Sequence, residues 1–276
     1  RVQGGDPRPG QLTGRTVGLL FAEASTRTRF SFEMAARRLG ADTLAFSEVG
    51  SSMSKGETLL DTARLLVSVG ADALVVRHQA VGAARLLSER LGVPVINAGD
   101  GTAEHPTQAL LDLYTLTQHL GDLEGRTVAI VGDVTHSRVA RSGCFGLIAL
   151  GARVRVAGPP TLCPPELRAL GVQVFHSIDE ALDSVDAVMM LRIQRERIGG
   201  VKLPPDGEYH AMYALTEDRV RRLPEHALVL HPAPMNRGVE IDDAVADGPR
   251  SVIFEQMANG VWVRMACLLE ALEVPP

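Results

Sequence analysis

The chain has 276 residues, of which 45% are hydrophobic and 22% are charged, a composition typical of a globular protein with one large or two ordinary domains. A formal net charge of -5 and an aromatic content of 4% argue against a nucleic-acid surface, which is normally basic and offers rings for base stacking. The sequence shows no signal-peptide pattern and no apolar run of about 18 residues, so it predicts no membrane span.

In the first half of the chain, short apolar segments alternate with helical patterns. The opening, residues 1–14, is rich in Gly and Pro and predicts a loop. We expect strands over residues 16–21, 43–47, 73–76 and 94–98. A helix is expected after each strand, and these helices end near residues 40, 70, 90 and 120.

The spacing of apolar residues also predicts which side of a helix faces the core. In the helix that ends near residue 40, we expect the core-facing side to carry Phe30, Met34 and Leu39. In the helix that ends near residue 120, the expected core-facing residues are Leu110, Leu113 and Tyr114.

A hinge at residues 121–125 is expected to lead into a second unit, with a closing helix over residues 259–272. The strands of this unit are predicted over residues 127–131, 153–157, 173–175, 187–191 and 228–230. Alternating strands and helices form parallel sheets covered on both faces, so we predict an α/β protein of two doubly wound domains. We place residues 1–121 with 259–276 in one domain and residues 122–258 in the other, and expect the ligand site in the cleft between them.

One stretch, Ser25-Thr26-Arg27-Thr28-Arg29, combines hydroxyls and guanidiniums where a strand ends and a helix begins. A helix N-terminus presents free backbone N–H groups and partial positive charge, and Arg adds a two-pronged grip on phosphate or carboxylate. The stretch is therefore typical of a phosphate cradle. A plain helix cap with solvated arginines is the alternative interpretation.

Other polar clusters also follow predicted strand ends, where open α/β sheets bind ligands. They are residues 51–55, Arg77-His78, residues 105–108, His136-Ser137-Arg138, Arg192-Ile193-Gln194 and residues 231–234. Each cluster has an alternative interpretation as helix capping, rigid loop or solvated surface. We assign no role to Gly238-Val239-Glu240.

The sequence lacks the patterns of several common catalytic and cofactor-binding sites. The order Lys55-Gly56 is not that of a Walker motif, and Val128 to Asp133 lacks the further glycines of a dinucleotide fold. No Gly-x-Ser-x-Gly elbow and no metal-ligand spacing is present. The three cysteines are far apart, which favours a reducing compartment without disulfides. We therefore expect neither a metal nor a cofactor.

Five motifs in this order resemble the aspartate/ornithine transcarbamoylase family. They are residues 25–29, Lys55-Gly56-Glu57-Thr58, Arg77-His78, His105-Pro106-Thr107-Gln108 and His231-Pro232-Ala233-Pro234. The last motif has no cysteine, which makes it similar to the aspartate-type members rather than the ornithine type. The family often has Pro where this chain has Ala24, and the chain begins so close to residues 25–29 that we expect an opening helix of the family to be missing.

The resemblance implies transfer of a carbamoyl group from carbamoyl phosphate to L-aspartate, giving N-carbamoyl-L-aspartate and phosphate for pyrimidine synthesis. It also implies a cytoplasmic homotrimer with shared sites, into which Ser51 and Lys55 reach from a neighbouring subunit. A regulatory chain and a dihydroorotase are candidate partners, which the sequence itself does not reveal. The alternatives are an ornithine-type acceptor and a non-catalytic anion-binding α/β module.

The same resemblance implies a role for individual residues. Carbamoyl phosphate would be bound by Ser25, Thr26, Arg27, Thr28, Ser51, Arg77, His105 and Gln108. Thr28, Lys55, Arg77 and His105 would be the catalytic residues. Aspartate would be bound by Lys55, Arg138, Arg192 and Gln194, and the backbone at Ala233 and Pro234 would hold the amine and the carbonyl group.

Overall fold

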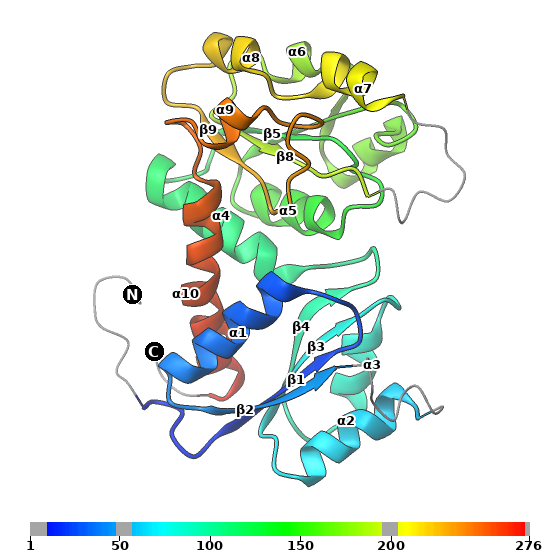
Figure 1. Ribbon diagram of the computed structural model, residues 1–276, viewed down its shortest axis with the longest axis vertical. Helices are drawn as coiled ribbons and strands as arrows, with labels where there is room; N and C mark the ends of the chain where they lie inside the picture. Colours follow the sequence, from blue (N-terminus) through cyan, green and yellow to red (C-terminus); the bar gives the residue numbers. More distant parts are fainter. Residues whose placement is uncertain (1–9, 48–56, 195–203, 274–276) are drawn as a thin grey trace. The chain divides into compact units, whose positions relative to one another are not determined.

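The computed structural model describes residues 10–47, 57–194 and 204–273 of the chain (Figure 1). The chain forms two compact units. Unit 1 comprises Arg1–Thr107 and Ala258–Pro276, and unit 2 comprises Gln108–Met257. None of the helices in the described ranges has both the length and the hydropathy that a membrane crossing requires.

Unit 1 contains a parallel four-stranded sheet with the strand order β2-β1-β3-β4. Its strands are β1 (Thr16–Phe21), β2 (Asp42–Ser47), β3 (Ala73–His78) and β4 (Val95–Asp100). All four predicted strands are confirmed. Strand β3 runs two residues further than predicted, so Arg77 and His78 are its last residues and not the start of a loop.

Helices cover both faces of this sheet, as Figure 1 shows. They are α1 (Thr26–Arg38), α2 (Leu59–Ser68), α3 (Ala83–Arg90) and the end of α10 (Ile253–Ala271). Side chains alternate between the two faces of a strand. Thus Val17 and Leu19 of β1 pack with α1 and α10, whereas Leu20 packs with α2 and α3.

Two helices turn a different side to the core than the sequence predicted. Phe30 and Met34 of α1 are 58% and 43% exposed, and the buried side carries Phe32, Ala35, Ala36 and the following Leu39. In α4 (Pro106–Leu120), Leu110 is 48% exposed, while Leu113 and Tyr114 are half-buried. The buried side of α4 carries Leu111, Asp112, Thr115 and Leu116. The prediction followed the largest apolar residues, but the core here uses alanines and buried polar groups.

Unit 2 contains a parallel five-stranded sheet with the order β7-β6-β5-β8-β9. Its strands are β5 (Thr127–Val131), β6 (Arg153–Ala157), β7 (Gln173–Phe175), β8 (Ala187–Met190) and β9 (Leu228–Leu230), which confirms the five predicted strands. Its further helices are α5 (Arg138–Ala149), a 3-10 helix (Pro165–Leu170), α6 (Ile178–Ala181), α7 (Asp206–Tyr213), α8 (Glu217–Arg222) and α9 (Asp243–Ala246).

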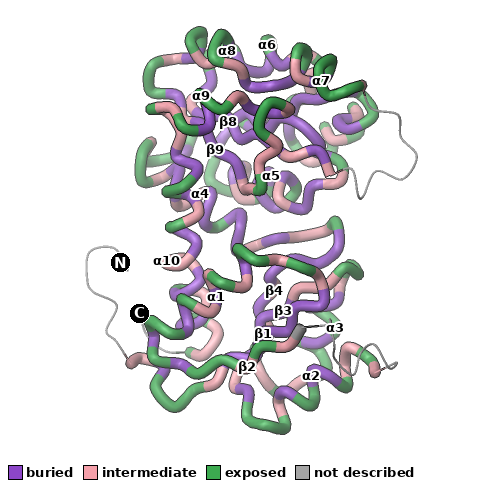
Figure 2. Tube along the Cα trace, in the orientation of Figure 1, coloured by how far each residue is buried: buried purple, intermediate pink, exposed green. Residues whose placement is uncertain are grey.

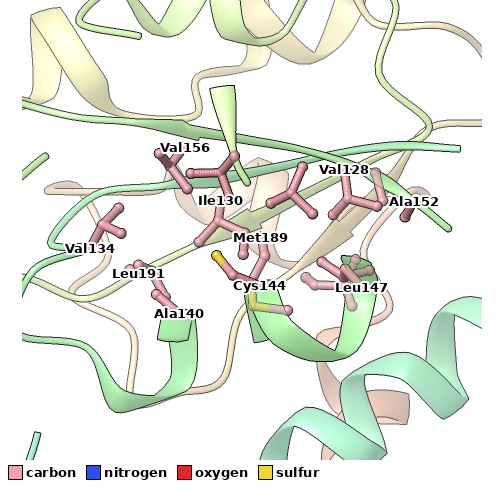
Figure 3. Packing of buried hydrophobic residues seen from close by; sticks show 14 of the residues in the cluster. Val128, Ile130, Val134, Ala140, Cys144, Leu147, Ala152, Val156, Met189 and Leu191 are labelled. Carbon is pink, nitrogen blue, oxygen red and sulfur yellow. The ribbon is translucent and has the colours of Figure 1, made fainter. Parts of the chain in front are cut away.

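The core of unit 2 lies on both faces of this sheet. On one face, Val128, Ile130 and Met189 pack against Cys144 and Leu147 of α5 (Figure 3). On the other face, alternate residues of the same strands pack against α6, α8 and α9. Figure 2 shows the resulting pattern of buried strands and exposed outer helix surfaces. Burial raises the pKa of the Cys144 thiol to about 12, so this cysteine is part of the core and not a nucleophile.

The first strands of the two units begin in the same way. The backbone N–H of Thr16 donates to Asp72 at 2.8 Å, and that of Thr127 donates to Asp186 at 2.8 Å. In each case the preceding arginine also donates to the same carboxylate, at 2.9 Å. These hydrogen bonds lie at the amino ends of the strands. The polar clusters predicted as ligand sites lie at the carboxyl ends.

Candidate active site

The N-terminus of α1 is open to an anion. Ser25 occupies the N-cap position, but its side chain makes no capping hydrogen bond, and the first turn holds no acidic residue. The expected helix start is confirmed, while the interpretation of Ser25 as a plain capping side chain is wrong. The orphan N–H groups of the first turn and the exposed Arg27 therefore offer positive potential at this point.

A buried polar cluster lies beside this helix start. Thr28 Oγ1 lies 3.5 Å from His105 Nε2, and Arg77 Nη1 lies 3.4 Å from the same ring nitrogen. Arg77 also donates to Glu23 at 3.4 Å and to the Ala98 carbonyl at 3.3 Å. The structure thus brings together Thr28, Arg77 and His105, which come from α1, the end of β3 and the residue before α4.

The donors in this cluster fix the state of the imidazole. A guanidinium carries donors only, so its hydrogen bond to His105 requires Nε2 to be the acceptor. The Thr28 hydroxyl can donate to the same nitrogen. Two donors therefore converge on one acceptor position, which is the arrangement that a carbonyl oxygen of a ligand would also satisfy.

In unit 2, the end of β5 holds a buried carboxylate. Asp133 Oδ1 accepts hydrogen bonds from the backbone N–H of His136 at 3.2 Å and from its Nδ1 at 2.8 Å. Asp133 Oδ2 accepts from the backbone N–H of Gln194 at 3.4 Å. The Gln194 side chain donates through Nε2 to the His136 carbonyl at 3.2 Å, which leaves Oε1 as the end able to accept from a ligand.

A glycine makes this turn possible. Gly132 has φ +128°, and a Cβ there would lie 2.7 Å from the carbonyl oxygen of Leu191. Only a residue without a side chain allows β5 to approach the end of β8 so closely. The approach sets Asp133 next to the segment that carries Arg192, which is half-buried.

Arg138 is the first residue of α5 and is buried. Buried arginines are rare, and a cation at a helix N-terminus opposes the positive end of the helix dipole. Ser137 caps the helix through its Oγ, which accepts from the Ala140 N–H at 3.1 Å. A guanidinium at this place is able to bind a carboxylate of a ligand.

The third segment of unit 2 is the loop after β9. Ala233 has φ +54°, a left-handed conformation that costs a non-glycine residue about 1–2 kcal/mol, and the Ala233–Pro234 peptide bond is cis. His231 Nδ1 accepts from the Ala233 N–H at 2.9 Å, and Nε2 lies 3.2 Å from Glu240 Oε1. The loop is thus held by a buried histidine and by Glu240, for which the sequence analysis predicted no role.

Gln108 lies in the first turn of α4, and its Nε2 donates to Asp112 at 2.8 Å. Of the other predicted site residues, Thr26 is exposed, Ser25 is half-buried, and Ser51 and Lys55 lie outside the described residues. Sequence reasoning missed four carboxylates that contact predicted site residues: Glu23, Asp112, Asp133 and Glu240. The positions of Glu23 and Asp133 just after strand ends were the signal that could have indicated two of them.

Two family models together cover most of the chain. The carbamoyl-P binding domain of aspartate/ornithine carbamoyltransferase matches residues 3–118, and the Asp/Orn binding domain matches residues 124–271. The chain belongs to the aspartate/ornithine carbamoyltransferase family. The family recognised from the five motifs is thereby confirmed.

Similar family members are of the aspartate type. The aspartate carbamoyltransferase catalytic subunit of Halothermothrix orenii is 56% identical over 257 residues, which cover 93% of this chain and 82% of the relative. Aspartate transcarbamoylase from Trypanosoma cruzi in complex with carbamoyl phosphate has a TM-score of 0.85 and 34% identity, covering 97% of this chain and 86% of that one. The same enzyme in complex with carbamoyl aspartate and phosphate has a TM-score of 0.83 and 34% identity, covering 97% and 85%.

Proposed function

We propose that this protein transfers the carbamoyl group of carbamoyl phosphate to the amine of L-aspartate, releasing N-carbamoyl-L-aspartate and phosphate. Membership of the family supports the reaction class, and the aspartate-type relatives support the acceptor. The observation that carries the proposal is the convergence of Thr28 and Arg77 on His105 Nε2 beside an uncapped helix N-terminus. The product belongs to pyrimidine synthesis.

Carbamoyl phosphate is the donor. Its phosphate dianion suits the free N–H groups at the start of α1 and the side chains of Ser25, Thr26, Arg27 and Thr28. Its carbonyl oxygen would take the place that His105 Nε2 now holds as acceptor, receiving hydrogen bonds from Thr28 and Arg77. The charge that develops on this oxygen in the tetrahedral state would be stabilised by these donors and by His105 in its Nε2–H tautomer.

L-Aspartate is the acceptor, and its two carboxylates match the guanidiniums of Arg138 and Arg192. Gln194 Oε1 would accept from the substrate amine, since its Nε2 already binds the His136 carbonyl. Backbone groups at Ala233 and Pro234 would hold the amine and the carbamoyl group. Ser51 and Lys55, outside the described residues, complete the proposed set, with Lys55 near both reactants.

The bond changes need no metal and no side-chain base. The neutral amine nitrogen attacks the carbonyl carbon, a C–N bond forms, and the C–O bond to phosphate breaks. The departing phosphate accepts the amine proton. Because only the neutral amine attacks, activity should fall as the pH is lowered.

We also propose a cytoplasmic homotrimer with shared active sites, to which Ser51 and Lys55 are donated by a neighbouring subunit. Family membership supports this assembly. Cys144, Cys163 and Cys267 are free thiols, which favours a reducing compartment. The relatives' description as a catalytic subunit supports a second kind of chain as partner, either regulatory or a dihydroorotase.

Phosphate release from carbamoyl phosphate, measured with and without L-aspartate, tests the proposed function. We expect release that depends on aspartate and saturates with its concentration. A protein that binds phosphate but shows no aspartate-dependent release would be an anion-binding module and would overturn the proposal.

A further inference from the structure

A row of buried polar side chains in unit 2 connects Gln108 and His231 through two residues without an assigned role, Asp112 and Gln256. Asp112 Oδ1 accepts from Gln108 Nε2 at 2.8 Å and from Gln256 Nε2 at 2.6 Å. Gln256 Oε1 in turn accepts from the backbone N–H of His231 at 3.0 Å. Gln108, Asp112, Gln256 and His231 are all buried. The row links the start of α4 to the loop after β9 through the first turn of α10.

The carboxylate determines the direction of every bond in this row. Asp112 Oδ1 accepts both hydrogen bonds, so both glutamines turn their NH2 groups toward Asp112. The amide oxygen of Gln256 then faces the His231 N–H, and the amide oxygen of Gln108 is the end left to accept from a carbamoyl NH2 group. A reversed amide at either glutamine would place two donors or two acceptors together.

The fixed direction of the hydrogen bonds continues into the loop after β9. Because the Ala233 N–H can only donate, His231 Nδ1 must be unprotonated, and His231 therefore donates through Nε2 to Glu240. Glu240 Oε1 also accepts from the Asn236 backbone N–H. One run of hydrogen bonds thus connects the Gln108 amide with the backbone that carries Ala233 and Pro234.

Stability alone does not explain these residues. Replacing a buried polar network by well-packed apolar side chains is often neutral or stabilising. The neighbours on the same helices, Leu111 and Leu116 of α4 and Ile253 of α10, are apolar and fully buried or nearly so. Directional hydrogen bonds between buried side chains do, however, favour one arrangement of these side chains.

We propose that Asp112 and Gln256 are positioning residues that set the Gln108 amide and the loop after β9 in a fixed relation to each other. The inference rests on the proposed function, in which the loop serves the attacking amine, and on the role in carbamoyl phosphate binding that the family resemblance implies for Gln108. Neither Asp112 nor Gln256 touches a reactant in this account. Their effect is to hold the side chain of Gln108 and the backbone of His231 in one arrangement within unit 2.

The test exchanges the carboxylate and the amide between positions 112 and 256. Gln256→Glu places a carboxylate against that of Asp112 and removes the donor to Asp112. We therefore expect kcat and the affinity for carbamoyl phosphate to fall about ten- to hundredfold. Both contacts of Asp112 end on Oδ1, so in the double variant Asp112→Asn/Gln256→Glu the amide at 112 turns about χ2, donates through Nδ2 to the carboxylate at 256 and accepts from Gln108 through Oδ1. We therefore expect the double variant to recover most of the lost kcat and affinity.

The measurements are kcat, KM for each substrate, carbamoyl phosphate binding by calorimetry without aspartate, and thermal unfolding midpoints. Thr115→Val is the matched control, because Thr115 is buried on α4 and donates to the Leu111 carbonyl of its own helix at 2.7 Å. It should lower the unfolding midpoint and leave kcat unchanged. Should Gln256→Glu fail to fold, Gln256→Met replaces it, with the same kinetic loss expected.

Two results would overturn the inference. One is a single variant that folds and keeps the kcat and carbamoyl phosphate affinity of the parent chain. The other is a double variant that regains thermal stability but not kcat, which would make the network a support of the fold only. The parent chain is assayed in parallel. An inactive parent chain would count against the proposed function. The positioning role would then still be tested by the calorimetric binding of carbamoyl phosphate.

Discussion

His105 Nε2 is the atom on which the donor side of the site depends, because Thr28 and Arg77 both point to it. We expect His105→Ala to lower kcat by about a hundredfold, the usual cost of one donor to a developing oxyanion. KM for aspartate should change little, since aspartate is assigned to Arg138, Arg192, Gln194 and Lys55 and not to His105. Steady-state kinetics check this, with His226→Ala as the control because His226 is exposed. A reduced kcat in both variants would contradict a specific role for His105.

Arg192 is expected to act on binding and not on turnover. Arg192→Ala removes a charge-assisted contact to a carboxylate, so KM for aspartate should rise about ten- to hundredfold while KM for carbamoyl phosphate stays near its original value. The measurement is a pair of saturation curves at a fixed excess of the other substrate. Equal, mild effects on both KM values would remove Arg192 from the aspartate site.

Site residues that belong to a motif can be predicted from the sequence. Residues whose role depends on their burial in the folded chain cannot. Thr28, Arg77 and His105 were found from motif order, and the structure brings them into one cluster. Asp112 and Glu240 were missed because a carboxylate in a sequence is by default a surface residue. Only the folded chain shows that both are buried and hold polar partners.

At the scale of elements, strands were predicted more accurately than helix faces. Strands β1 and β5 match their expected bounds because continuous apolar runs indicate buried parallel strands. The prediction for α1 was wrong because Phe30 and Met34 are spaced for one helix face, whereas the buried side combines Phe32 with the small residues Ala35 and Ala36.

Two aspartates tie the amino ends of strands in both units, and they make stability depend on pH. Hydrogen bonds from the Thr16 N–H and from Arg15 hold the pKa of Asp72 below its usual value. Burial raises the pKa of Asp186, but the hydrogen bonds from the Thr127 N–H, His226 and Arg126 outweigh it and lower that pKa overall. A carboxylate with a depressed folded-state pKa stabilises the fold above its unfolded pKa and loses this effect as the pH falls through the folded value.

Asp186→Asn should therefore destabilise the protein by about 1–3 kcal/mol at neutral pH, the range for hydrogen bonds to a charged group. The difference from the parent chain should stay constant down to about pH 5 and shrink below about pH 4. Urea unfolding followed by circular dichroism at several pH values measures this. Asp218→Asn, at an exposed ion pair with Arg221, is the control and should change little. A difference that persists unchanged at pH 3 would contradict the assignment.

For the whole molecule, composition and alternation predicted two α/β units with parallel sheets, and the structure has them. The division into compact units falls after Thr107 and Met257, inside α4 and α10. The sequence prediction placed the boundaries at residues 121 and 259, and the two family models, which match residues 3–118 and 124–271, also change over near residue 121. A helix that passes from one unit into the next leaves no break in the sequence pattern for a reader to find.

Shared active sites in the proposed trimer predict complementation. Lys55→Ala and Arg27→Ala chains should each be nearly inactive alone. When the two are unfolded, mixed and refolded together, some sites would combine an intact Lys55 with an intact Arg27, and activity should return in part. The measurement is carbamoyl-aspartate formation by the mixture against each variant alone. A mixture no more active than its components would place Lys55 in its own subunit's site.

The most direct measurement of the central claim is a competition between acceptors. Purified protein is given carbon-13-labelled carbamoyl phosphate with equal concentrations of L-aspartate and L-ornithine, and the products are identified by NMR. We predict labelled N-carbamoyl-L-aspartate, formed in equal amount to phosphate, with no labelled citrulline above the enzyme-free background. Citrulline as the main product, or no product dependent on protein, would contradict the account.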